Sequence, residues 1–139
     1  MTSQQPLPRT AGVHHVGLTV PDLHEASTFF RDALAFEAIG GVPDYPSVFL
    51  SDGSVMLTLW QAANGTDATP FDRRHNLGLH HLSLQVAAEQ DLDALHEDLA
   101  ARDDVEIEFA PETLGNGPTR HLMCAIPGGI RLELIAPGG

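Results

Sequence analysis

Residues 12–20 read G-V-H-H-V-G-L-T-V, and residues 78–86 read G-L-H-H-L-S-L-Q-V. Both stretches carry a pair of histidines at the same place in an alternating apolar pattern, which is typical of a half-buried strand. Such a repeat indicates two copies of one supersecondary module within a single compact domain. Each copy would contribute an equivalent histidine to a shared centre, which favours a metal site built on internal pseudo-symmetry.

The first copy opens with a strand over Val13–Val20, which Pro21-Asp22 ends. Asp22 followed by Glu25 has the spacing of a capping box and predicts a helix over Leu23–Ala35. Gly40-Gly41 and Pro43–Pro46 are turn signals. Two strands are then predicted, joined by the hairpin signal Asp52-Gly53, near Ser47–Leu50 and Ser54–Trp60.

The second copy repeats the plan with a strand over Leu79–Val86 and a helix over Glu89–Arg102. Its further strands are predicted at Val105–Phe109, Arg120–Ile126 and Ile130–Ile135. The chain of 139 residues therefore predicts an α+β fold of two tandem βαβββ modules in one domain over residues 12–139. We place module 1 at about 12–61, a crossover loop at about 62–77 and module 2 at about 78–137.

Composition narrows the possible partners. The formal net charge is -12, so nucleic acid and anionic membrane surfaces would be repelled. There is no apolar run of about 18 residues to span a membrane. Met1 to Thr10 lack the basic start and apolar centre of a signal peptide, so we expect a flexible tail over residues 1–11. Cys124 is the single cysteine, which excludes a thiolate metal cluster and fits a cytoplasmic protein.

Strand alternation brings three metal-binding side chains together. His15 and His81 lie on the strand faces opposite the apolar residues that must meet the helices. In the last strand, Glu133 lies opposite Leu132 and Leu134, so two imidazoles and one carboxylate converge on the concave side of the sheet. Such a triad leaves open positions on an octahedral ion and suits one divalent metal, Fe2+, Mn2+, Ni2+, Co2+ or Zn2+.

With these residues in view, the chain resembles the vicinal oxygen chelate superfamily, which includes glyoxalase I, bleomycin-resistance proteins, fosfomycin-resistance enzymes and extradiol dioxygenases. The matching stretches are H-V-G-L-T-V-P-D, S-T-F-F-R-D-A-L-A-F, H-L-S-L-Q-V and P-G-G-I-R-L-E-L-I, which together cover about residues 12–137. The resemblance implies paired βαβββ modules around an open, barrel-like cavity. It also implies metal ligands at His15, His81 and Glu133, and a homodimer.

The sequence differs from the family pattern at positions that glyoxalase I and extradiol dioxygenases use for catalysis. Aligning the two repeats places Thr58 where glyoxalase I carries a second metal-binding glutamate, and a hydroxyl is neither a strong ligand nor a general base. Extradiol dioxygenases carry a tyrosine where this chain has Met123. Their second catalytic histidine has no counterpart, because the loop Gly65–Asp72 contains none.

The same alternation predicts the wall of a small-molecule pocket. Its members are mainly apolar with a few polar groups, as expected of such a site: Met56, Thr58, Trp60, Ser83, Gln85, Met123 and Arg131. His121 lies on this face and is the candidate general acid or base. His14 and His80 point the other way and are expected to be structural histidines beneath the helices.

We therefore expect a divalent-metal-dependent enzyme that chelates two neighbouring oxygens of a small organic substrate. Dioxygenase chemistry ranks first, because three protein ligands leave room for O2 and a bidentate substrate, with isomerase or lyase chemistry next. The alternative is a binding protein of the bleomycin-resistance type, which sequesters a cationic drug without catalysis. The net charge of -12 and a pocket containing Trp60 suit that alternative, whereas the intact set of ligands argues against it.

Overall fold

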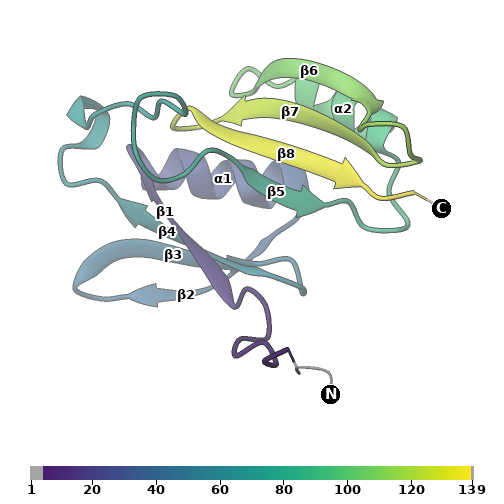
Figure 1. Ribbon diagram of the computed structural model, residues 1–139. Coiled ribbons are helices and arrows are strands. Elements are labelled where there is room, and N and C mark those ends of the chain that lie inside the picture. The colour runs from purple at the N-terminus through teal and green to yellow at the C-terminus, as the bar shows by residue number, and fades with distance from the viewer. Residues whose placement is uncertain (1–4, 139) are drawn as a thin grey trace.

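The computed structural model describes residues 5–138, which form two four-stranded sheets and two α-helices (Figure 1). In chain order the elements are β1 (His15–Val20), α1 (Leu23–Leu34), β2 (Glu37–Val42), β3 (Tyr45–Ser51), β4 (Met56–Gln61), the 3-10 helix η1 (Gly65–Asp67), β5 (Leu82–Gln85), α2 (Leu92–Ala100), β6 (Glu106–Thr113), β7 (Arg120–Ile126) and β8 (Ile130–Ala136). The strand orders are β1-β4-β3-β2 and β5-β8-β7-β6. The predicted α+β fold of two βαβββ modules is confirmed, and the sheets form no closed barrel.

The chain before β1 carries no helix or strand over residues 5–11. Residues 1–4 of the predicted tail lie outside the described residues. No helix within residues 5–138 is long and apolar enough to cross a membrane.

Helix α1 begins where the capping signal predicts. The Asp22 carboxylate accepts a hydrogen bond from the Glu25 backbone N–H at 3.0 Å, which satisfies one of the free donors of the first turn. The helix ends at Ala35, whose φ of 59° is the left-handed conformation usual at this position. Phe29 and Phe30 are fully buried, so this helix anchors the hydrophobic core.

The βαβββ plan includes strand β2, but no residues were assigned to it, because its Gly40-Gly41 pair was interpreted as a turn. All six of its residues are exposed, and it forms the edge of its sheet with two register shifts against β3. A Cβ on Gly41 would lie 2.8 Å from the Ser47 carbonyl oxygen, so the close approach of β3 requires glycine there. The glycines therefore mark an irregular edge strand, for which apolar alternation gives no signal.

The second module departs from prediction mainly at element ends. Helix α2 begins after Asp91, whose carboxylate accepts from the Asp93 N–H at 2.9 Å. It is shorter than the predicted Glu89–Arg102, and β5 is shorter than the predicted Leu79–Val86. Strand β6 is longer than Val105–Phe109 and pairs with β7 through two register shifts.

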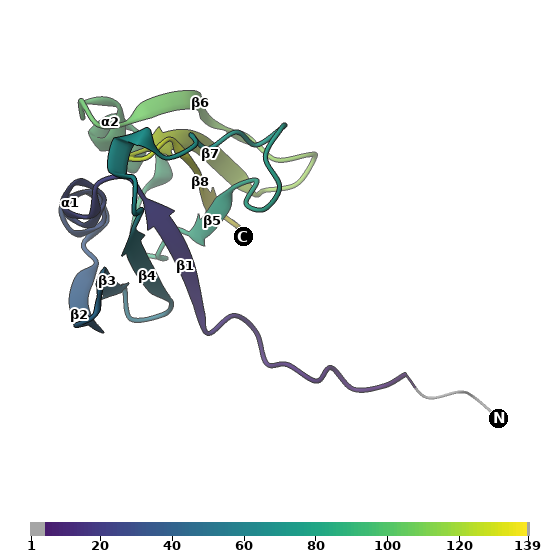
Figure 2. The ribbon, with the colours of Figure 1, turned by 90° about the vertical axis from the view of Figure 1, so that its left-hand side faces the viewer.

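Buried side chains of both modules form one hydrophobic core. Its fully buried strand residues include Leu50, Leu57, Leu59, Leu122 and Leu132. Figure 1 shows α1 between the two sheets, and Figure 2 shows both helices on the same side of them. The strand faces opposite this core therefore carry the polar residues on which a site can be built.

Strand register confirms the alignment of the repeats. Gly17 on β1 is opposite Thr58 on β4, and the equivalent Ser83 on β5 is opposite Glu133 on β8. Both pairings are parallel, so Thr58 and Glu133 occupy the same place in the two modules.

Candidate metal and catalytic site

Glu133 lies at the centre of a cluster on the polar face of the second sheet. Its neighbours Leu132 and Leu134 are buried in the core, whereas its carboxylate faces the opposite side and is 12% exposed. Oε2 accepts a hydrogen bond from Nδ1 of His121 at 2.6 Å. Oε1 lies 3.6 Å from Nε2 of His81. The two carboxylate oxygens thus face two different imidazoles.

The surroundings keep this carboxylate ionised. Burial alone would raise the pKa of Glu133, but hydrogen bonds from His121 and Ser83 stabilise the charged form. The net effect lowers the pKa of Glu133 below its ordinary value. Glu133 is therefore a charged acceptor at neutral pH, which is the form in which a carboxylate binds a metal ion.

His121 on β7 is held on both sides. It is 8% exposed, and its ring packs edge-on against Phe109 with 4.9 Å between the ring centres. Because the Glu133 carboxylate only accepts, Nδ1 of His121 carries the donated hydrogen. Nε2 is the free ring nitrogen, 3.7 Å from Oε1 of the more exposed Glu112. This arrangement leaves one oriented nitrogen for proton transfer.

An arginine network borders the cluster. Arg131 is 9% exposed and makes two hydrogen bonds to Glu108, at 2.9 and 2.7 Å. Arg73 of the crossover loop adds contacts of 3.1 and 3.2 Å to the same carboxylate. The hydrogen bond from Arg131, with help from Arg73 and against the cost of burial, lowers the pKa of Glu108 to about 2.

Glu108 was not singled out from the sequence, and this network was therefore missed. The expectation for His14 and His80 was wrong, because both are exposed rather than beneath the helices. Nδ1 of His80 lies 2.8 Å from Nδ1 of His81 and 3.3 Å from Nη1 of Arg131.

The first module places His15 at the exposed start of β1. Its Nδ1 lies 2.9 Å from Nδ1 of His14, which repeats the contact between His80 and His81. His15 makes no ion pair with Glu133, and residues 5–138 contain no group of three His, Cys, Asp or Glu side chains arranged to hold one ion. The structure therefore joins His81 to Glu133 and leaves His15 on the other sheet.

Thr58 forms a different contact from its counterpart Glu133. It is 3% exposed, and its hydroxyl accepts a hydrogen bond from Nε1 of Trp60 at 2.9 Å. A Cβ on Gly17 would lie 3.1 Å from this hydroxyl, so glycine leaves room for the pair. The rings of Tyr45 and Phe49 pack on Trp60 with centres 4.9 and 5.6 Å away. The polar face of the first sheet is therefore largely aromatic here.

We expect Thr58→Ala to leave divalent-metal affinity unchanged, because the hydroxyl is bound to Trp60 and is no ligand. The variant should lose about 1 kcal/mol of stability through the missing acceptor. Isothermal titration with Mn2+ and denaturant unfolding measure both effects, and Thr58→Ser is the matched control that keeps the hydroxyl. Loss of metal binding in the alanine variant would place Thr58 among the ligands.

The remaining predicted pocket residues occupy the same sheet faces with different exposure. Met56 is half-buried on β4, and Met123 is buried opposite Glu133 on β7. Ser83 and Gln85 are exposed on β5. Their role as the wall of a substrate pocket stays a prediction.

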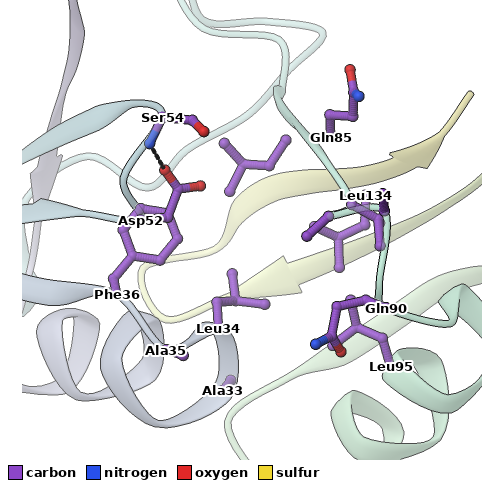
Figure 3. A pocket seen from close by; sticks show the side chains of 14 residues that line it. Ala33, Leu34, Ala35, Phe36, Asp52, Ser54, Gln85, Gln90, Leu95 and Leu134 are labelled. Atoms are coloured by element: carbon purple, nitrogen blue, oxygen red, sulfur yellow. Dashed lines mark hydrogen bonds between the residues drawn. The ribbon is translucent and has the colours of Figure 1, made fainter.

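A separate cavity of about 610 Å3 lies between the modules, and Figure 3 shows its walls. Leu34 and Phe36 at the end of α1 face Leu134 and Leu95 across it, with Asp52 and Gln90 at its polar margins. It contains none of the three predicted metal ligands, and Gln85 is its only predicted pocket residue.

The sequence of this chain is similar to those of known proteins. A model of the "Glyoxalase/Bleomycin resistance protein/Dioxygenase superfamily" matches residues 12–134. The 2-epi-5-epi-valiolone epimerase of an Actinomyces species is 31% identical over 151 residues, which cover 93% of this chain and 81% of that protein.

Solved structures show the same fold. The glyoxylase/bleomycin resistance protein/dioxygenase domain from Frankia sp. EAN1pec is 27% identical, with a TM-score of 0.75 over 92% of this chain and 93% of that one. Lactoylglutathione lyase from Agrobacterium tumefaciens is 21% identical, with a TM-score of 0.69 over 93% and 96% of the two chains. The lyase supports the fold alone.

Proposed function

Because the chain belongs to the glyoxalase/bleomycin resistance protein/dioxygenase superfamily, we propose that it is a metal-dependent isomerase that inverts a carbon centre beside a carbonyl group. The relative named as an epimerase favours this chemistry over the dioxygenase reaction that the sequence ranked first. The substrate class is a small ketone with neighbouring hydroxyl groups. The observation that carries the proposal is the Glu133 carboxylate, which faces His81 with one oxygen and His121 with the other.

The donor set suits a divalent cation. Nε2 of His81 and Oε1 of Glu133 are 3.6 Å apart, close enough for both to contact one ion at ordinary bond lengths of about 2.0–2.2 Å. His15 is the third proposed ligand, since it is equivalent to His81 in the repeat. A bound metal would supply Lewis-acid stabilisation of the negative charge that develops on the substrate oxygen.

His121 is the proposed acid and base. Glu133 holds its Nδ1–H, so Nε2 can take the proton from the carbon beside the carbonyl while the C–H electron pair moves into the carbonyl group. The deprotonated substrate is then an enolate anion. A solvent water molecule on the opposite face then protonates the same carbon, which restores the ketone with inverted configuration, and the hydroxide that remains takes up the proton held on Nε2 of His121.

The proposed substrate pocket combines the two unlike sheet faces. Ser83 and Arg131 supply polar groups, whereas Met56, Met123 and the Thr58–Trp60 pair supply apolar contacts. Gln85 adds an amide at the far end of β5. Most pockets for small molecules have such walls, with few polar groups that set orientation.

The direct test offers 2-epi-5-epi-valiolone to the protein in D2O after loading with Fe2+, Mn2+, Co2+, Ni2+ or Zn2+ in turn. We expect one epimer to form, with deuterium at the inverted carbon, as seen by proton NMR. O2 consumption with catechols instead would favour a dioxygenase. If the protein shows no deuterium exchange and no O2 consumption with any of these metals, the result would contradict an enzyme of either class on these substrates.

A sequestering protein is the second candidate, because the Tyr45, Phe49 and Trp60 rings gather on one face of a chain with net charge -12. Aromatic faces attract cations, and the negative field of the protein adds to that attraction. Tight binding of a cationic glycopeptide drug such as bleomycin by the metal-free protein, with no turnover, would favour this function over the isomerase.

We also propose that the protein is a cytoplasmic homodimer in which His15 of one chain completes the half-site of another. Coexpression of His15→Ala with His81→Ala tests this arrangement. If the ligands come from two chains, the mixed dimer has one site with no substitution, so it should regain about half of the wild-type metal content. If each chain builds its own site, every site is damaged and the mixture should bind no metal.

A further inference from the structure

A chain of polar contacts leads from the protein surface to His81. Glu108 holds both the Nε and Nη2 groups of Arg131, at 2.9 and 2.7 Å. Nη1 of Arg131 lies 3.3 Å from Nδ1 of His80 and 3.5 Å from its carbonyl oxygen. Nδ1 of His80 in turn lies 2.8 Å from Nδ1 of His81. Each step is within hydrogen-bond distance.

The direction of these hydrogen bonds follows from the arginine. A guanidinium only donates, so a neutral His80 next to Arg131 is favoured with an unprotonated, accepting Nδ1. The 2.8 Å contact between Nδ1 of His80 and Nδ1 of His81 needs one hydrogen. Because Nδ1 of His80 is an acceptor, its one lone pair is shared between Nη1 of Arg131 and Nδ1 of His81. His81 therefore carries its hydrogen on Nδ1, and its Nε2 has a free lone pair.

This lone pair faces a second acceptor. Nε2 of His81 lies 3.6 Å from Oε1 of Glu133, and a carboxylate oxygen accepts rather than donates hydrogen bonds. Two acceptors at this distance with no hydrogen between them repel each other unless a cation lies between them. The tautomer of His81 thus prepares the pair for a metal ion.

We propose that Glu108, Arg131 and His80 form a positioning chain that holds His81 in the Nδ1–H tautomer and keeps its Nε2 free for the divalent metal. The chain rests on the proposed function in taking His81 as a ligand. In this role Glu108 and Arg131 are not ligands of the metal. They act through His80, as the hydrogen-bond partners of ligating histidines do in other metal sites.

The first module provides an internal comparison. His14 and His15 repeat the Nδ1 contact at 2.9 Å, but Met56 is opposite His15 in the register. A thioether cannot donate a hydrogen bond, so nothing equivalent to Arg131 selects the tautomer of His15. The positioning chain therefore distinguishes the two halves of an otherwise repeated sequence.

The test is two-bond nitrogen–proton NMR on metal-free protein labelled with 15N-histidine, at about pH 8, where ordinary imidazoles are neutral. The spectrum reports which ring nitrogen carries the hydrogen. We expect His81 to be the Nδ1–H tautomer in the wild type. Arg131→Met, which introduces the residue of the first module, should convert His81 to a mixture containing the Nε2–H form, while the signals of His15 stay unchanged.

Metal titration of the same samples gives the second readout. Arg131→Met should weaken Mn2+ or Zn2+ binding by about 10–100-fold, the usual effect of losing such a partner. Arg120→Met is the matched control, because Arg120 also makes two hydrogen bonds to one carboxylate, that of Asp93, at 3.0 Å each. Glu108→Gln weakens the positioning chain without removing a buried side chain. It should also shift His81 towards the Nε2–H tautomer.

An Nε2–H tautomer for His81 in the wild type, or no change at His81 in either variant, would overturn the positioning chain. A tautomer that shifts as expected while metal affinity stays at the wild-type value would also overturn it. A wild-type protein with the expected tautomer that binds no divalent metal would overturn the proposed function instead, so the two failures are distinct.

Discussion

Replacing Glu133 by glutamine is expected to lower divalent-metal affinity by more than about 100-fold, because outer partners of metal ligands alone contribute about 10–100-fold. Glutamine keeps the size of the side chain and can still accept the hydrogen bond from Nδ1 of His121. What it removes is the charge that attracts the ion beside His81. Mn2+ and Zn2+ titrations of the two proteins measure the loss, and circular dichroism verifies that the fold is kept.

The matched control is Glu112→Gln. Glu112 also lies near the cluster, with Oε1 3.7 Å from Nε2 of His121, but its side chain is 59% exposed and its ion pair is with His121 rather than with His81. This variant should bind metal as the wild type does. Equal affinity of Glu133→Gln and wild type would remove Glu133 from the site.

Replacing His121 by asparagine should lower the rate of epimerisation by about 10²–10⁴-fold, the usual contribution of a general acid or base. The asparagine amide can still donate to Glu133 in place of Nδ1, but it has no counterpart of Nε2. Metal content should therefore remain at the wild-type value while turnover and deuterium exchange fall. Single-turnover NMR in D2O measures the rate.

His75→Asn is the control for the His121 variant. Nδ1 of His75 likewise faces a carboxylate, that of Asp72, at 2.8 Å, but its side chain is 79% exposed in the crossover loop. Loss of the His75 imidazole should leave the rate of epimerisation unchanged. A His121→Asn protein that exchanges deuterium at the wild-type rate would assign the proton transfer to another group.

Most of the fold was predictable because apolar alternation and turn residues agree along the chain. Helix α1 begins at the predicted residue, Leu23, where the capping signal coincides with the helical period. Strand β7 spans the predicted residues Arg120–Ile126, where the apolar alternation is clear. Strand β2 could not be found in this way. It is exposed on every residue, and its glycines are required by the approach of β3 rather than by a turn.

The candidate site was predictable only within the second module. The alternation of β7 and β8 predicts that His121 and Glu133 share one face, and in the structure the two side chains form a hydrogen bond. The contacts of His80 depend on Arg131 and on Glu108 of a third strand. Long side chains from separate strands meet through rotamers that no local pattern specifies.

The measurement that tests the account most directly is the divalent-metal content per chain of untagged wild-type protein and of His81→Ala, purified together and measured by plasma mass spectrometry. We expect about one metal ion per wild-type chain and none in the variant. A wild-type protein that holds no divalent metal even after reconstitution with Fe2+, Mn2+, Co2+, Ni2+ and Zn2+ would contradict it.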